Sequence, residues 1–524
     1  MRRFKVLTHL FPNPGSFLDD GSPTFDLAKR EQRRKTGVMR MRVTLQLLSL
    51  LLAMTLPPAN SHAAAMERGV AITDPEVLRV LDNSGLSLAN LLGAKTGSTS
   101  AELFALPSMA PLQAATDRDF NTYVLQHKDD LGKLHLFDRD ALNASGTRFE
   151  LAGITNRMDR AYVAPKQCGE IRLIYRPIAN SESTRKESPP SRLPMTLNLV
   201  MKARPANVRD ATCAELARRW LAMADQPPAP EHAAMLTARG GALEWIAHHA
   251  IDRIEIDVQI ARASTEASDF EGRADYLMKV FRHYGKRFEE SPLENQIDVA
   301  RIQADAKLLA DFKQWLLDPA QIANLDRGTI VLPDRFLAAS AVNQTPAHTD
   351  VNQKARELFT DDDIVVALAK ASANAPLQNL LSPAGFARRL DDMTCSGCHQ
   401  IRAIGGFHLP GAERAAWAAG AVVAAGSPHF FGDQERRRDV LMAFRDGRPP
   451  DLSRGFSARP QQRRSGELAG TTYVNGWGAV CDAAGATAAP DRSFTSWTCA
   501  EGLTCQPMAG ANESRTGFCF PKDK

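Results

Sequence analysis

The chain has 524 residues, 44% of them hydrophobic and 24% charged, which is typical of globular proteins of two or three domains. Its formal net charge of +4 is misleading, because the first 65 residues hold 10 Lys and Arg against 4 Asp and Glu. The rest carries 54 basic against 56 acidic residues, a net of about −2. No basic surface for nucleic acid or anionic lipid is therefore expected.

The first 65 residues have the features of a secretory signal. A short apolar run, Val43 to Leu56, follows two arginines and precedes small residues, which predicts cleavage near Ala63 or Ala65. The polar, basic stretch before Met39 is expected to be an over-called start. Neither this run nor any later one is long enough to span a bilayer, so we expect no integral membrane segment in the mature chain.

Residues 66–360 are expected to form an α+β region, with a break between two subdomains considered near residue 263. Alternating apolar residues predict strands of an antiparallel sheet at Phe149–Ile154, Ile171–Tyr175, Met195–Met201, Ile254–Ile260 and Asp275–Phe281, with a short one at Ile330–Leu332. Helical spacing predicts helices at Pro75–Leu81, Ser87–Leu92, Ala211–Ala224, Ala242–Ala250 and Ile302–Leu317.

One stretch of this region concentrates charge beside a strand. It contains Asn156, Arg157, Asp159, Arg160, Glu170 and Arg172. Such a cluster could face a ligand, but ion pairs that fix a loop to a sheet edge are common, and we favour that explanation. The pair His248 and His249 is a poor metal site, because adjacent residues on a helix point about 100° apart.

The central motif is Cys395-Ser396-Gly397-Cys398-His399. Two thiols three positions apart, followed by an imidazole, match the covalent attachment of haem, with His399 as the proximal iron ligand. A zinc site would need a second pair of ligands, and the next cysteine is Cys481. A thioredoxin-like motif would need a βαβ unit, and a Cys395–Cys398 disulfide would close a strained loop. One haem c per chain is expected.

By this motif the chain resembles c-type cytochromes. The resemblance covers residues 361–447 and implies a mainly α, cytochrome c-like domain. A helix is predicted to begin at Thr360 or Asp361, whose acidic first turn suits a helix start better than a calcium loop. Helices at Glu413–Ala425 and Asp433–Arg445 follow the motif, which gives the order of elements found in small cytochrome c domains.

The second axial ligand of the iron distinguishes two functions. An iron with two protein ligands transfers electrons, whereas an iron with an open position can bind a small molecule. In the family that the chain resembles, this ligand comes from a loop before the last helix, where His429 stands. His408 is a weaker candidate that could lie near a haem propionate. Met442 is also weaker, because it falls within a helix beside Leu441 and is better explained as a core residue.

The other six cysteines are expected to form disulfides, which suits an oxidising compartment. The simplest pairing joins Cys168 to Cys213 and makes two bonds among Cys481, Cys499, Cys505 and Cys519. Residues 448–470 are predicted to be a linker and residues 471–524 a small disulfide-rich module. That module is interpreted as a stabilising cap or, second, as a docking unit.

Two functions remain open at this point. The first is an exported monohaem c-type cytochrome that transfers electrons to a redox partner protein, in the periplasm or as a secreted protein. The alternative is a haem-dependent oxidase or peroxidase-like enzyme, in which the upstream α+β region builds a substrate pocket over an open iron. The size of that region favours the alternative, because a bare cytochrome domain needs only about 100 residues.

Overall fold

The computed structural model describes residues 69–179, 191–204, 211–226, 229–263, 274–345, 353–397, 428–456, 475, 479–483, 491–507 and 515–521. The predicted signal segment and the predicted helix Glu413–Ala425 lie outside these residues. Among the helices that are described, none combines the length and apolar character needed to cross a membrane.

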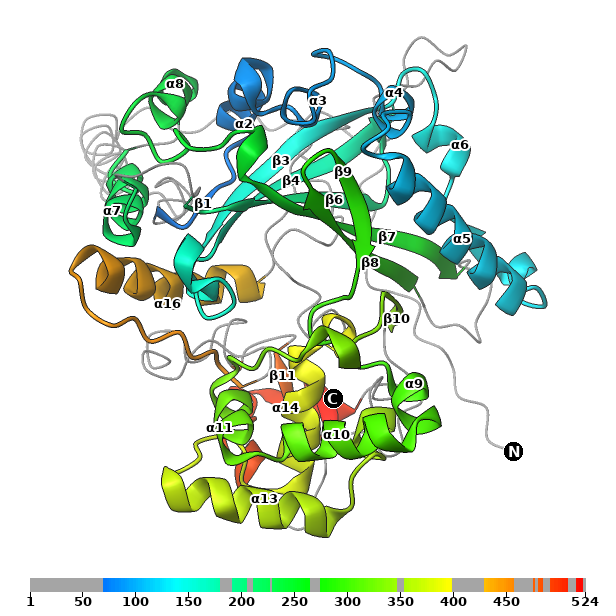
Figure 1. Cartoon of the computed structure of the whole chain (residues 1–524), viewed down its shortest axis with the longest axis vertical. Helices are drawn as coiled ribbons and strands as arrows, with labels where there is room; N and C mark the ends of the chain where they lie inside the picture. The colour runs from blue at the N-terminus through cyan, green and yellow to red at the C-terminus, as the bar shows by residue number, and fades with distance from the viewer. Residues whose placement is uncertain are drawn as a thin grey trace, which may run out of the picture. The chain divides into compact units, whose positions relative to one another are not determined.

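A ten-stranded antiparallel sheet is the largest element of the described residues (Figure 1). Its main order is β1-β3-β4-β6-β7-β8-β10, while β2 pairs with β7, β5 with β4 and β9 with β8. The strands are β1 (Ala71–Ile72), β2 (Leu134–Leu136), β3 (Arg148–Arg157), β4 (Glu170–Ala179), β5 (Ser191–Arg192), β6 (Met195–Lys202), β7 (Ile251–Ala263), β8 (Ala274–Tyr284), β9 (Arg287–Ser291) and β10 (Ser340–Thr345). The predicted antiparallel sheet is confirmed. The break considered near residue 263 falls between β7 and β8, which pair with each other.

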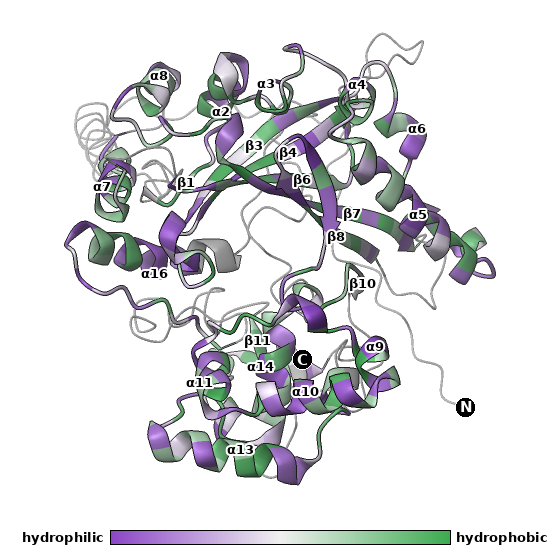
Figure 2. Cartoon of the chain, in the orientation of Figure 1, coloured by the Kyte–Doolittle hydropathy of each residue, from purple (hydrophilic) through white to green (hydrophobic). Residues whose placement is uncertain are grey.

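The two faces of the sheet differ in polarity because successive side chains of a strand point to opposite sides. One face is apolar and carries the main core, with Leu173, Leu199, Ile254 and Phe281 all fully buried. The other carries charged and polar residues from the same strands. Figure 2 shows hydrophobic and hydrophilic residues mixed along these strands.

Helices cover the apolar face. They are α2 (Pro75–Leu81), α3 (Leu88–Leu91), α4 (Ser100–Phe104), α5 (Ala110–Gln126), α6 (Arg139–Leu142), α7 (Cys213–Met223) and α8 (Ala233–Thr237). The helix predicted at Ala242–Ala250 was wrong: turns lead there into a short 3₁₀ segment, His248–Ala250. Leu243 donates its N–H to the carbonyl of Leu236, which ties the backbone to α8 instead of to a helical turn.

A second hydrophobic core is built by helices α9 (Val299–Ala304), α10 (Ala306–Leu316), α11 (Pro319–Arg327), α13 (Asp361–Asn374) and α14 (Pro383–Met393). The single helix predicted at Ile302–Leu317 is two helices, because the Asp305 carboxylate accepts the N–H groups of Lys307 and Leu308 and starts α10 afresh. The strand predicted at Ile330–Leu332 is absent: Asn295 bonds the carbonyl of Ile330 and the N–H of Leu332 in place of a neighbouring strand.

The helices of residues 361–447 divide between the two cores. The predicted helix start is confirmed, since Thr360 and Asp363 form a reciprocal capping box at α13. Both α13 and α14 pack in the second core, whereas α16 (Pro428–Arg445) contributes Leu441 to the main core. The loop expected around His429 is the first turn of α16.

The C-terminal part contains a small three-stranded sheet, β11 (Val480–Asp482), β13 (Thr516–Pro521) and β12 (Leu503–Pro507), in that order. The predicted pairing is confirmed: disulfides join Cys168 to Cys213, Cys481 to Cys505 and Cys499 to Cys519. The module contacts α14, where the Ser382 hydroxyl donates to the Asp491 carboxylate over 2.7 Å. The Leu381 N–H donates to the Ser493 hydroxyl over 3.0 Å.

Candidate functional site

The motif Cys395-Ser396-Gly397-Cys398-His399 follows directly on α14. The Thr394 hydroxyl donates to the carbonyl of Asp391 over 2.8 Å and accepts the N–H of Gly397 over 2.9 Å, which closes a turn that carries Cys395. A Cβ at Gly397 would lie 2.0 Å from the Asp391 carbonyl oxygen, so only glycine fits at position 397. Cys398 and His399 lie outside the described residues.

Cys395 is half-buried and belongs to none of the three disulfides. Its side chain packs against Met278 and Val280 of β8 and Leu293 of the following loop. Its Sγ lies 3.4 Å from the carbonyl oxygen of Glu294. The thiol therefore stands against an apolar wall formed by the otherwise polar face of the sheet.

The charged residues predicted to cluster do come together. Arg157 pairs with Asp159 at 2.9 Å, Arg160 with Glu170 at 2.8 Å, and Arg172 with Glu170 at 2.7 Å. These side chains are 12% exposed or less, which is unusual for charged residues and requires that they be paired. The loop after β3 is thereby fixed to the sheet, as the ion-pair explanation expected.

The structure extends this group to what we call the arginine cluster: Arg157, Asp159, Arg160, Glu170, Arg172, Arg253, Glu255, Glu294, Asp433, Arg436 and Arg437. Arg253 reaches Glu170 at 2.8 Å, and Arg436 reaches Asp159 at 2.8 Å. The cluster thus joins β3, β4 and β7 to α16 and to the loop after β9.

Two sequence signals could have revealed part of this extension. Arg253 and Glu255 are two positions apart on β7, so they share one face of that strand, the face that carries Arg172 on β4 across β6. Asp433 stands three and four positions before Arg436 and Arg437, the spacing of paired residues on one helix. No local pattern marks Glu294.

Mutual pairing keeps the cluster charged. Burial alone would raise the pKa of Glu170, but Arg160, Arg253 and Arg172 outweigh it and hold that pKa well below its usual range. Asp159 behaves likewise, with burial opposed by Arg157, Arg436 and Arg437, and its pKa is also held well below the usual range.

Glu294 links the arginine cluster to the motif. Its carbonyl oxygen faces the Cys395 thiol, while its carboxylate pairs with Arg160. The next residue but one, Gln296, accepts the N–H of Ser396 through its side-chain oxygen at 3.1 Å. Two neighbouring positions of the motif are therefore held by the same short loop.

These surroundings fit a haem. The group has an apolar macrocycle and two carboxylates, and Cys395 lies between an apolar wall and a cluster rich in guanidinium groups. Arg436 Nη1, Asn156 Nδ2 and Tyr162 Oη are among the buried donors of the described residues that have no acceptor. Buried donors of this kind are normally satisfied, and carboxylates are the acceptors that arginine prefers.

The candidate distal ligands are placed only in part. His408 lies outside the described residues, and so does the side chain of His429. Met442 is partly buried and packs against the main hydrophobic core. His248 bonds the carbonyl of Leu91 through Nδ1 at 2.8 Å, while His249 is exposed.

Comparison with protein families, with curated proteins and with solved structures found no match for this chain.

Proposed function

We propose that the chain is an exported monohaem c-type cytochrome that transfers single electrons to a redox partner protein. Cys395 and Cys398 would hold the haem c covalently, and His399 would be its proximal iron ligand. The observation that supports this most is the placement of Cys395. Its side chain packs against an apolar wall, and its Sγ contacts Glu294, the residue whose carboxylate joins the arginine cluster.

When bound, the haem supplies reversible one-electron chemistry. The residues of the chain orient it and set its surroundings. Met278, Val280 and Leu293 exclude water beside Cys395. The arginine cluster would offer donors for the propionates, among them Arg436 Nη1, which needs an acceptor, and the nearby Tyr162 Oη is a further buried donor without one. Burial and nearby charge are the means by which a protein tunes such a potential.

The periplasm or the extracellular space is proposed as the place of action. The apolar run at Val43–Leu56 supports export, and the three disulfides suit an oxidising compartment. Haem c attachment takes place in the same setting in the family that the chain resembles.

A haem-dependent oxidase or peroxidase-like enzyme is the second candidate. One observation favours it. The polar face of the large sheet lies toward the motif, and the buried pair Arg160 and Glu170 is therefore close to the loop that contacts Cys395. An electron carrier alone does not require such a face. In this function the iron would keep an open distal position.

Absorption and electron paramagnetic resonance spectra of the purified protein, with and without carbon monoxide, test the proposal. A low-spin iron that ignores carbon monoxide is expected for an electron carrier, and His429→Ala should then convert it to high spin if His429 is the distal ligand. Prompt binding of carbon monoxide to a high-spin iron would contradict the carrier and support the enzyme.

A further inference from the structure

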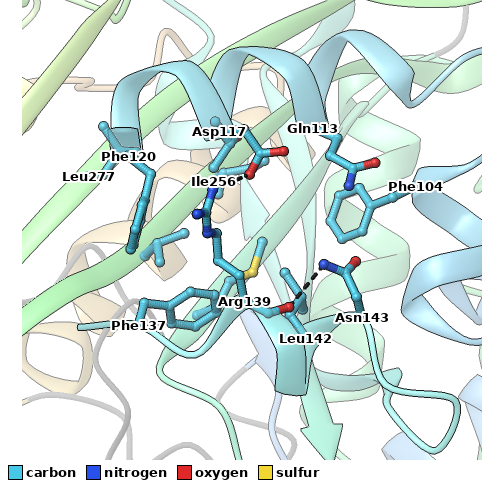
Figure 3. A pocket seen from close by; sticks show the side chains of 13 residues that line it. Phe104, Gln113, Asp117, Phe120, Phe137, Arg139, Leu142, Asn143, Ile256 and Leu277 are labelled. Atoms are coloured by element: carbon cyan, nitrogen blue, oxygen red, sulfur yellow. Dashed lines mark hydrogen bonds and ion pairs between the residues drawn. The ribbon is translucent and has the colours of Figure 1, made fainter. Parts of the chain in front are cut away.

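A pocket opens on the apolar face of the large sheet, between α5, α6 and the strands β6, β7 and β8 (Figure 3). The space within and in front of it amounts to about 520 Å³, a figure that counts open solvent at its mouth, so the enclosed part is much smaller. Its strand wall is formed by Met195, Ile256, Val258 and Leu277. Because Leu277 and Met278 are neighbours on β8, the pocket and the wall beside Cys395 lie on opposite faces of the same strand.

Three phenylalanines, Phe104, Phe120 and Phe137, form much of the remaining lining, together with Leu142. In Figure 3 the rings of Phe120 and Phe137 flank one side of the pocket, and Phe104 lies on the other. Aromatic rings favour edge-to-face and offset contacts with another ring. This lining therefore suits the aromatic ring of a ligand better than a flexible alkyl chain.

The polar lining groups carry no net charge. Arg139 pairs with Asp117 at 3.0 Å, and its guanidinium also lies over the Phe120 ring at 4.4 Å. A carboxylate ligand would compete with Asp117, and a cationic ligand would meet the Arg139 charge. A neutral ligand avoids both costs.

Two carboxamides and the buried hydroxyl of Thr116, which has no hydrogen-bond partner among the described residues, complete the polar lining. Asn143 donates to the carbonyl of Arg139 over 2.9 Å, which fixes its orientation. The Gln113 side chain has no hydrogen-bond partner among the described residues and extends toward the pocket from α5 in Figure 3. A carboxamide offers both a donor and an acceptor, so it can satisfy a hydroxyl group.

We infer that this pocket binds a small neutral aromatic molecule with one hydroxyl group, of the phenol type. The ring packs among the phenylalanines, and the hydroxyl bonds the Gln113 carboxamide. This is the usual composition of a small-molecule site, an apolar cavity with a few polar groups that fix orientation. The inference does not depend on haem attachment.

Calorimetric titration of the mature chain with phenol, toluene and benzoate tests the inference. Phenol is expected to bind at about millimolar affinity or tighter, with toluene weaker and benzoate weakest. Binding of benzoate as tight as that of phenol, or no binding of phenol at millimolar concentration, would overturn it.

Three variants locate the site. Leu142→Trp fills the pocket and should weaken phenol binding at least about tenfold, whereas Leu125→Trp, at a position 73% exposed on α5, should leave it unchanged. Gln113→Leu should weaken phenol but not toluene. If circular dichroism shows that Leu142→Trp does not fold, Gln113→Leu is the deciding variant. An equal loss of affinity for phenol and toluene, or no loss of affinity for phenol, would refute the proposed orientation.

Discussion

Arg436 is the residue through which α16 reaches the arginine cluster. Its guanidinium donates to Asp159 at 2.8 Å and to Asp433 at 2.6 Å, and its side chain is only 8% exposed. Nearby Asp433 owes its charge to the same contacts: burial opposes ionisation, but Arg436 and Arg437 hold its pKa far below the usual range. Loss of this guanidinium leaves two carboxylates with fewer partners.

Arg436→Met is therefore expected to lower the free energy of unfolding by about 3–5 kcal/mol, the usual cost of removing one partner from a buried pair. Arg445→Met is the control on the same helix. Arg445 pairs with Asp446 in an exposed setting, so no measurable change is expected. Urea unfolding followed by circular dichroism measures both. Equal effects of the two variants would contradict the role given to Arg436.

The stability of the folded chain is expected to depend on pH through Asp82. Burial and then the charge of Glu150 raise its pKa from 3.8 to about 7, and Oδ1 has no hydrogen-bond partner. Because the folded state binds this proton more tightly than the unfolded state, the contribution of Asp82 to stability is fully present below pH 4. It is lost as the pH rises toward 7.

Asp82→Asn should accordingly stabilise the protein at pH 8, by up to about 4 kcal/mol, and have a much smaller effect at pH 4. Thermal unfolding across this range measures the difference. Asp140→Asn, at an exposed position, serves as the control. A gain for Asp82→Asn that does not change with pH would show that the charge of Asp82 is not its cause.

At the scale of elements, α14 is held from two sides before it leads into the motif. Arg389 of α14 is fully buried and donates to the carbonyls of Leu325 and Asp326 at the end of α11. It also donates to the carbonyls of Arg454 and Gly455, which precede the C-terminal module. The segment before the module thus holds the helix that leads to Cys395, and the module itself bonds Leu381 and Ser382 just before that helix.

Arg389→Met should release residues 454–456 and lower the free energy of unfolding by about 3 kcal/mol or more, because several buried carbonyls lose their donor. Arg327→Met, an exposed arginine at the end of α11, is the control. Hydrogen exchange should quicken in residues 454–456 only in the first variant. Unchanged exchange there would mean that Arg389 does not hold the segment.

Elements governed by local chemistry were predictable. The helix start at Asp361 followed from Thr360 and the acidic turn, and the main strands followed from their alternation. Predictions failed where a distant side chain decided the backbone. Asn295 bonds the segment Ile330–Leu332 through its amide, and Asp305 begins a new helix within a continuous apolar pattern.

At the scale of the whole chain, the arginine cluster gathers residues from Arg157 to Arg437 around one end of the sheet. Sequence reasoning grouped only those between 156 and 172, because their proximity is local. Arg253, Glu294 and Arg436 join them through the strand order and the packing of α16. Local spacing pairs Arg253 with Glu255 and Arg436 with Asp433, but it does not tell that these pairs meet Glu170 and Asp159. The spacing of Cys395, Cys398 and His399 is by contrast local and visible in the sequence, and their assignment to haem attachment stays a prediction.

The most direct measurement is the intact mass of the mature protein, with haem staining after denaturation, from a host that attaches haem to exported cytochromes. One haem per chain, resistant to denaturation and lost in the Cys395→Ala, Cys398→Ala double variant, is the predicted result. A folded chain that carries the three disulfides but no covalent haem would contradict the proposed function.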